Sequence, residues 1–213
     1  MKMSKRGHGL GPDEHGKIVR EGYNKIAREY YLERNLFKNE KEIQEFILYL
    51  PDNGSILDIG CGGGVPVLRT LIDMGFNAKG VDFSKGMIEI ARQNVPEADL
   101  ILGDITKMDF ESDSFDGIVS TYAFIHIFRT QHPILYSKIF NWLKPGGTML
   151  VGTASTESEE VSQYFGVPMA WSHPASNESL QLVKKIGFKV LFERHVTSGD
   201  ETNYWILAKK PVS

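Results

Sequence analysis

The feature that most constrains the fold is a regular alternation of short apolar segments with segments of helical spacing between residues 55 and 153. The apolar segments show no alternation of polar and apolar residues, so we expect strands that are buried on both faces. Strands that are connected through helices form a parallel sheet covered by helices on both sides, and such a sheet binds ligands beyond the carboxyl ends of its strands. The expected strands are 55–60, 77–82, 98–103, 115–120 and 148–153, and the expected helices between them are about 64–74, 84–95 and 131–143.

The segment before this alternation is expected to contain a tail and two helices. Residues 1–14 are rich in glycine and lysine and are expected to form a flexible tail. Helical spacing of apolar residues predicts helices from His15 to about Leu32 and from Asn39 to Leu50. We expect residues 15–50 to cover the ligand site at the carboxyl ends of the strands.

The last third of the chain has a different pattern. Residues 155–175 are expected to be irregular and to form a lid over a substrate. A helix at about 177–186 precedes two strands at about 188–196 and 202–210, which a close turn at 198–200 should pair antiparallel. The whole is expected to be one domain, 15–213, in the α/β class. Its sheet should have seven strands, be mostly parallel, and end in an antiparallel pair.

Composition excludes several classes of function. The chain has 213 residues and a formal net charge of −3, so it offers no large positive field and nucleic acid is not expected as a partner. No apolar stretch approaches the ~18 residues that a membrane span needs, and no signal-peptide core follows the basic N-terminus, so we expect a cytoplasmic protein. The single cysteine, Cys61, excludes an internal disulfide, and no His, Asp or Glu spacing indicates a metal site.

A glycine loop closes the first strand of the alternation. Asp58 precedes the loop, and the dinucleotide fingerprint would need a third glycine at position 65, which is Val65. Glycines allow a backbone to approach a ligand closely, so the loop indicates a nucleotide-like ligand other than a dinucleotide. The loop residues are Gly60, Cys61, Gly62 and Gly64.

The motifs, taken in order, resemble those of the class I S-adenosylmethionine-dependent methyltransferases. These are Rossmann-like enzymes with a seven-stranded sheet, and the resemblance covers roughly residues 20–210. The glycine loop corresponds to the family's first motif, Asp82 to the acidic end of its second strand, and Asp104 to its third acidic position. The segment Phe115–Ala123 and the turn Leu143–Gly147 match two further family features.

The resemblance implies S-adenosyl-L-methionine as cofactor and assigns roles around it. Asp58 would face the cofactor's ammonium, and Asp82 would accept two hydrogen bonds from its ribose. Asp104 would accept from the adenine amino group, with Phe83 and Ile105 against the ring. The alternatives are a carboxylate beside a helix N-terminus for Asp58, a helix cap for Asp82 and an Asx-turn for Asp104. Gly60 and Gly62 would lie against the methionine part, whereas Cys61 is more simply a small loop residue.

The segment after the fourth strand, which begins at Thr121, is expected to line the transfer site. His126 is the first candidate base, and its alternatives are a backbone-orienting role or a cofactor contact. His173 is a second candidate, within the expected lid. Tyr23 and Tyr30 lie seven residues apart, on one helix face, and either close over the cofactor or simply pack.

A small-molecule acceptor is the expected substrate. The Asn/Asp-Pro-Pro-aromatic segment of nucleobase amine methylation is absent after the fourth strand, as are the paired cysteines of pyrimidine methylation. Three alternatives remain: a cofactor-binding module without catalysis, a methyltransferase acting on tRNA or protein, and a nicotinamide oxidoreductase on the same fold. Val65 and the second acidic site at Asp104 argue against the oxidoreductase.

Overall fold

A seven-stranded sheet forms the centre of the structure, a computed structural model that describes residues 9–34, 39–198 and 201–212. Its strands are β1 (Ser55–Ile59), β2 (Asn77–Asp82), β3 (Asp99–Leu102), β4 (Phe115–Thr121), β5 (Leu143–Ala154), β8 (Lys189–Ser198) and β9 (Glu201–Lys209). Their order is β3-β2-β1-β4-β5-β9-β8, parallel from β3 to β5 and antiparallel on both sides of β9. The chain runs outward from β1 to β3 and then returns to β4 beside β1. This reversal opens a crevice at the carboxyl ends of β1 and β4.

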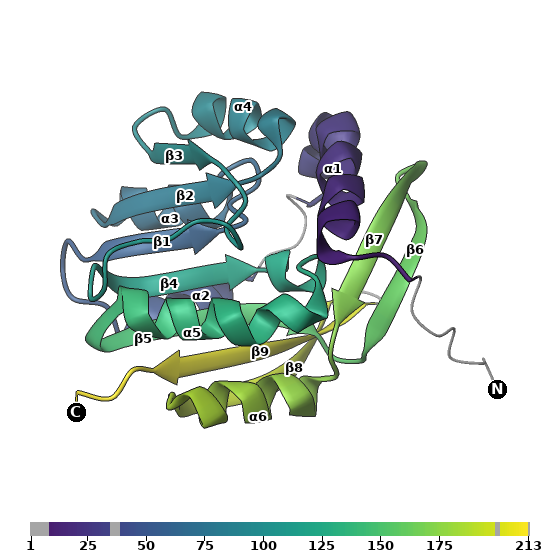
Figure 1. Ribbon diagram of the computed structural model, residues 1–213. Helices are drawn as coiled ribbons and strands as arrows, with labels where there is room; N and C mark the ends of the chain where they lie inside the picture. Colours follow the sequence, from purple (N-terminus) through teal and green to yellow (C-terminus); the bar gives the residue numbers. More distant parts are fainter. Residues whose placement is uncertain (1–8, 35–38, 199–200, 213) are drawn as a thin grey trace.

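Helices cover both faces of the sheet, as the sequence predicts (Figure 1). One face carries α5 (His132–Trp142) and α6 (Ser176–Ile186), and the other carries α2 (Glu40–Ile47), α3 (Val67–Asp73) and α4 (Lys85–Asn94). Successive strand residues serve opposite faces: Met149 and Val151 pack toward α5 and α6, whereas Leu150 packs toward α2 and α3. Both faces are buried, which explains the continuous apolar strands.

Helix α1 (Pro12–Arg34) stands across the carboxyl ends of the strands (Figure 1). Beside it lies a separate hairpin of β6 (Ser158–Tyr164) and β7 (Val167–His173). Val19 and Ile26 of α1 form a small buried cluster with Met169 and Ala170 of β7. Helix and hairpin together wall the open end of the sheet.

The N-terminal boundary differs from the expectation. Residues 1–8 of the expected tail lie outside the described part of the chain, but α1 begins at Pro12 rather than at His15. Proline suits the first position of a helix because its missing N–H would have no partner there. Asp13 and Glu14 add favourable charge in the first turn.

Two other expectations were wrong. Residues 158–173 are a regular hairpin rather than an irregular segment. The expected turn before the fifth strand lies inside β5, where the pairing shifts register so that Phe115 faces Leu143 and Gly117 faces Thr148. The antiparallel pairing of the last two strands is confirmed by Ser198 opposite Glu201, although Gly199 and Asp200 of the expected turn lie outside the described residues.

Candidate functional site

The glycine loop after β1 is tied to the end of β2 by Asp82. One carboxylate oxygen of Asp82 accepts the amide N–H of Gly62 at 3.0 Å, and the other accepts that of Ser84 at 2.8 Å. Ser84 also caps α4, because its hydroxyl accepts the amide N–H of Met87 at 3.3 Å. The residue that caps the helix is therefore Ser84 rather than Asp82, while Asp82 fixes the loop and keeps further lone pairs for a ligand.

Two glycines of the loop play different steric roles. Gly60 has φ +73°, and a Cβ there would lie 2.5 Å from the Cβ of Ala123. Gly62 has φ +53°, and a Cβ there would meet no atom within 4 Å. Gly60 thus allows the loop to pack against the residue after β4, whereas Gly62 leaves open space toward the cavity.

Asp58 lies buried beneath this loop, with 1% of its surface exposed. Its Oδ1 atom has no hydrogen-bond partner among the described residues. Burial raises the pKa of Asp58 to about 8, and the nearby carboxylate of Asp82 adds to that rise. Burial also raises the pKa of Asp82 to about 6, although the amides of Ser84 and Gly62 oppose the change. Two acidic groups thus lie close together, with Asp58 buried and Asp82 partly exposed, so a cationic ligand group would stabilise the charged form of both.

Asp104 forms the Asx-turn that was the alternative to a ligand role. Its Oδ1 accepts the amide N–H of Thr106 at 3.0 Å and the hydroxyl of Thr106 at 2.7 Å. The same side chain lines the cavity beside Phe83 and Ile105. The turn therefore holds Asp104 in place at the cavity wall.

A cavity lies beyond the carboxyl ends of β1, β2 and β4. It brings together most of the sequence-predicted residues: Gly60, Gly62, Asp82, Phe83, Asp104, Ile105, Thr121, Tyr23, Tyr30 and His126.

Four other predicted residues do not line this cavity: Asp58, Cys61, Gly64 and His173. Cys61 is 8% exposed and packs in the core, and burial raises the pKa of its thiol well above the ordinary value. A Cβ at Gly64 would lie 2.9 Å from Val95, so that glycine serves packing. The loop's contribution to the cavity therefore comes from Gly60 and Gly62.

His126 is held from two sides. Its Nδ1 lies 3.0 Å from the carbonyl oxygen of Ala170, and its Nε2 lies 2.9 Å from the hydroxyl of Tyr23. A carbonyl oxygen only accepts, so Nδ1 carries a proton, and when the ring is neutral its Nε2 accepts from Tyr23. The side chain of His15 further fixes this segment, because its Nε2 donates to the backbone carbonyl of His126 at 2.9 Å. The base candidate therefore meets the cavity together with Tyr23.

A second cavity adjoins the first through a shared wall. Four side chains line both: Tyr23, Tyr30, Tyr122 and His126. Tyr122 follows β4 with φ +68°, an uncommon conformation for a residue with a side chain, and its hydroxyl donates to Oδ1 of Asn39 at 2.8 Å. The hairpin supplies the far side of the second cavity, with Tyr164, Trp171 and His173. Burial lowers the pKa of His173, which is 5% exposed.

Tyr164 and Trp171 were missed as site residues because the hairpin itself was missed. Its two-residue turn is Phe165-Gly166, with φ values of +49° and +73°. Positive φ at both positions is the geometry that Asn-Gly or Asp-Gly normally signals in a sequence, and phenylalanine hides that signal. Only Gly166, between segments 158–164 and 167–173, could have indicated it.

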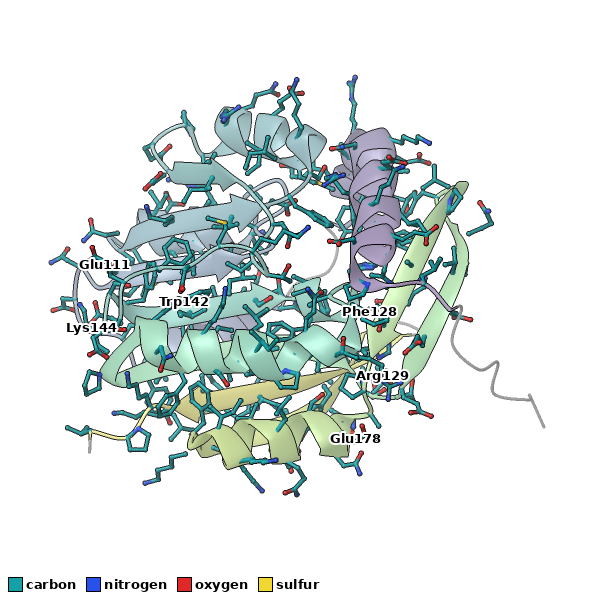
Figure 2. The ribbon with its side chains drawn as sticks, in the orientation of Figure 1. Glu111, Phe128, Arg129, Trp142, Lys144 and Glu178 are labelled. Carbon is teal, nitrogen blue, oxygen red and sulfur yellow. The ribbon has the colours of Figure 1, made fainter. Side chains whose placement is uncertain are left out.

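The base of the hairpin is anchored to the segment before α5. The amide N–H of Arg129 donates to the hydroxyl of Ser172 at 2.9 Å, and its guanidinium lies 3.7 Å from the carboxylates of Glu157 and Glu159. Figure 2 shows Arg129 beside the hairpin, whereas Lys144 lies at the opposite end of the sheet. Lys144 there donates to Asp116 at 2.8 Å. Asp116, the acidic residue of the segment Phe115–Ala123, is therefore remote from both cavities.

The described part of the chain contains no group of three His, Cys, Asp or Glu side chains placed to hold a metal ion. Within the same ranges, no helix combines the length and the apolar character needed to cross a membrane.

Known proteins resemble this chain in sequence and share its architecture. Residues 56–147 match the family model described as a methyltransferase domain. A demethylmenaquinone methyltransferase of Symbiobacterium thermophilum is 32% identical over 157 residues, covering 68% of this chain and 62% of that protein. The chain carries a methyltransferase domain like those of the class I S-adenosylmethionine-dependent enzymes. A phosphoethanolamine N-methyltransferase of Plasmodium falciparum is 27% identical, covering 90% of this chain and 74% of that one.

A solved methyltransferase structure has the same fold. The 1,6-didemethyltoxoflavin-N1-methyltransferase of Burkholderia thailandensis, with 1,6-didemethyltoxoflavin and S-adenosylhomocysteine bound, superposes with a TM-score of 0.73. The superposition includes 98% of this chain and 94% of the toxoflavin enzyme, at 15% sequence identity. The chain spans 62% and 51% of the lengths of the first two curated relatives.

Proposed function

We propose that this protein transfers a methyl group from S-adenosylmethionine to a small-molecule acceptor. The observation that carries the proposal is the shared wall of the two cavities. A cofactor in the cavity at the glycine loop and an acceptor in the cavity at the hairpin would meet at Tyr23, Tyr30, Tyr122 and His126. Transfer between two bound molecules depends mainly on such positioning.

The first cavity fits the proposed cofactor. The unpartnered Oδ1 of Asp58 suits an ammonium group, either directly or through water, and the open space at Gly62 suits a close backbone approach. Asp82 and Asp104 would hold the ribose and the adenine amino group, with Phe83 and Ile105 against the ring. When bound, S-adenosylmethionine supplies an electrophilic methyl group on a positively charged sulfur.

Tyr23 and His126 are the proposed proton acceptors. Tyr23 lines both cavities, and its hydroxyl already donates to Nε2 of His126. A proton leaving an acceptor could pass to the oxygen of Tyr23 as the tyrosine proton passes to His126. His173 contacts only the second cavity, so we assign it to acceptor contact rather than to the base role.

Helix α1 and the hairpin together serve as the proposed cover of the site. Tyr30 of α1 and Phe165 at the tip of the hairpin make a ring contact at 6.2 Å. A cover of this kind excludes water during transfer. This keeps the predicted roles of 15–50 and 155–175, with a hairpin in place of an irregular lid.

The relatives support a small acceptor. Their names specify a demethylmenaquinone, a sterol and phosphoethanolamine as acceptors of those proteins, and the toxoflavin enzyme was solved with a small heterocycle. A cofactor-binding module without catalysis is the second candidate, and it is favoured by one observation. A histidine base needs a free ring nitrogen to accept the substrate's proton, but the Nε2 atom of His126 already accepts a hydrogen bond from Tyr23.

The test separates binding from turnover. Calorimetry should show binding of S-adenosylmethionine and S-adenosylhomocysteine, and incubation with a metabolite pool should convert the first into the second. Tight binding without conversion across a broad pool would favour the module. Thermal stabilisation by NADH but by neither adenosyl compound would overturn the proposal altogether.

A further inference from the structure

Five aromatic rings form a closed circuit of contacts around the second cavity. They come from three parts of the chain: Tyr23 and Tyr30 from α1, His126 after β4, and Tyr164 and Trp171 from the hairpin. All five also line the cavity. The centroid distances around the circuit are 5.1 Å (Tyr23–Tyr30), 6.2 Å (Tyr30–Tyr164), 5.4 Å (Tyr164–Trp171), 4.5 Å (Trp171–His126) and 5.2 Å (His126–Tyr23).

The rings meet at steep angles. Three of the five contacts have interplanar angles of 84°, 87° and 87°, and the other two are tilted at 59° and 36°. A planar heterocycle is best held in a slot between two parallel rings, and none of these contacts is parallel. Rings set at steep angles to one another offer no such slot, and they suit a compact group that contacts ring faces and edges from several directions.

The charge of the cavity also selects the ligand. Among its lining residues in the described part of the chain, Glu201 is the one that carries a formal charge at neutral pH, and no lysine or arginine lines it. His173 stays neutral because burial lowers its pKa. A negatively charged lining repels carboxylates and phosphates and attracts cations.

We propose that the second cavity binds an amine acceptor, with the amine nitrogen and its alkyl substituents inside the five-ring circuit and Glu201 supplying the opposite charge. This rests on the proposed function and names its acceptor class. The ring faces stabilise a cation by their quadrupoles, and the five-ring circuit suits a tetrahedral, alkylated nitrogen.

The chemistry of amine methylation matches such a circuit. The deprotonated nitrogen uses its lone pair to form the new N–C bond, while the sulfur keeps the electron pair of the broken S–C bond. The nitrogen becomes positively charged as this bond forms, and a proton that it carried beforehand goes to Tyr23 and His126. The five-ring circuit therefore binds the transition state and the product cation more tightly than the neutral amine, which is the differential binding that accelerates a reaction.

The test compares two probes of the same shape. The (2-hydroxyethyl)trimethylammonium cation and its neutral carbon isostere, 3,3-dimethylbutan-1-ol, differ only in charge, and each is titrated calorimetrically into the full chain saturated with S-adenosylhomocysteine. We expect the cation to bind at least about 10-fold more tightly, which corresponds to about 1.4 kcal/mol. Equal affinities, or no binding of either probe, would overturn the proposal.

Variants assign the preference to the rings. Tyr164→Phe keeps the ring and should keep the preference for the cation, whereas Tyr164→Leu should reduce it several-fold, and Glu201→Gln should reduce it as well. Tyr49→Leu removes a ring that is 47% exposed and outside both cavities, so it should change nothing. A preference that survives Tyr164→Leu and Trp171→Leu would also contradict the proposal.

Binding of S-adenosylhomocysteine, measured first for every variant, shows that the variant is folded and keeps the two proposals apart. A protein that binds this compound but lacks the cation preference has lost only the amine assignment. A protein that binds neither adenosyl compound contradicts the proposed function itself.

Discussion

The hydroxyl of Tyr23 lies 2.9 Å from Nε2 of His126, although 103 residues separate the two along the chain. Helix α1 supplies the tyrosine and the segment after β4 supplies the histidine, so the contact joins the cover of the site to the sheet. The carbonyl oxygen of Ala170 on the hairpin fixes the other ring nitrogen at 3.0 Å. Three separate elements thus orient one pair of groups at the wall between the two cavities.

Tyr23→Phe should lower kcat by about 100-fold, the lower end of the range for a positioned acid or base, with little change in cofactor affinity. The substitution keeps the ring and removes only the hydroxyl. Tyr122→Phe is the matched comparison, because Tyr122 lines both cavities but donates to Asn39 instead, and its loss should be much smaller. Steady-state kinetics measures both, and equal losses would show that the Tyr23 hydroxyl has no special role.

Asp82→Asn should weaken binding of S-adenosylmethionine by about 10- to 100-fold, since it removes a charged hydrogen-bond acceptor. It should also cost about 1–3 kcal/mol of stability, because an amide nitrogen cannot accept the N–H of Gly62 or Ser84. Asp99→Asn on the neighbouring strand is the control, since its carboxylate is 62% exposed and pairs with Lys79 at the surface. Unchanged affinity in calorimetry would refute the ribose role of Asp82.

Gly60→Ala should destabilise the protein by more than the backbone strain alone. A Cβ at Gly60 would lie 2.5 Å from Ala123, whereas Gly166 has the same φ of +73° with no atom within 4 Å. Gly166→Ala therefore measures the cost of the left-handed conformation, about 1–2 kcal/mol. Urea unfolding should show a clearly larger loss for Gly60→Ala, and equal losses would show that the loop relaxes away from Ala123.

The free protein should lose stability between about pH 4 and pH 8 through Asp58. Its pKa is about 8 in the folded protein, above the ordinary value of 3.8, so the folded state keeps a proton that the unfolded chain has lost. Stability from this group is therefore highest at low pH and falls as pH rises toward 8. Asp58→Asn removes this dependence, so its melting temperature relative to the original protein should rise between about pH 4 and pH 8. A gap that stays constant over this range would mean that Asp58 is not the titrating group.

Much of the fold follows from local patterns in the sequence. The apolar strands reveal a parallel sheet because both faces of that sheet are covered, and Ser84 reveals the start of α4 because a helix needs a cap. The glycine loop, Asp82 and Asp104 are found for the same reason, since each lies at or just beyond the end of a strand that the sequence marks.

The second cavity could not be found in this way. It depends on contacts between distant segments, such as Tyr23 with His126 and Tyr30 with Tyr164, which no local pattern encodes. The hairpin that closes it turns at Phe165, a residue that rarely adopts positive φ, so its turn carries little sequence signal. The burial of Asp58 beneath the loop likewise depends on packing that no local pattern encodes.

The most direct test of the central claim is to follow the methyl group itself. The protein is incubated with a cell extract and S-adenosylmethionine that carries a deuterated methyl group, and the small molecules are then analysed by mass spectrometry. We predict a new small-molecule product that carries the deuterated methyl group, together with S-adenosylhomocysteine, and neither in a parallel reaction with Asp82→Asn at low cofactor concentration. Label that appears only in protein or RNA, or no transfer despite cofactor binding, would contradict the account.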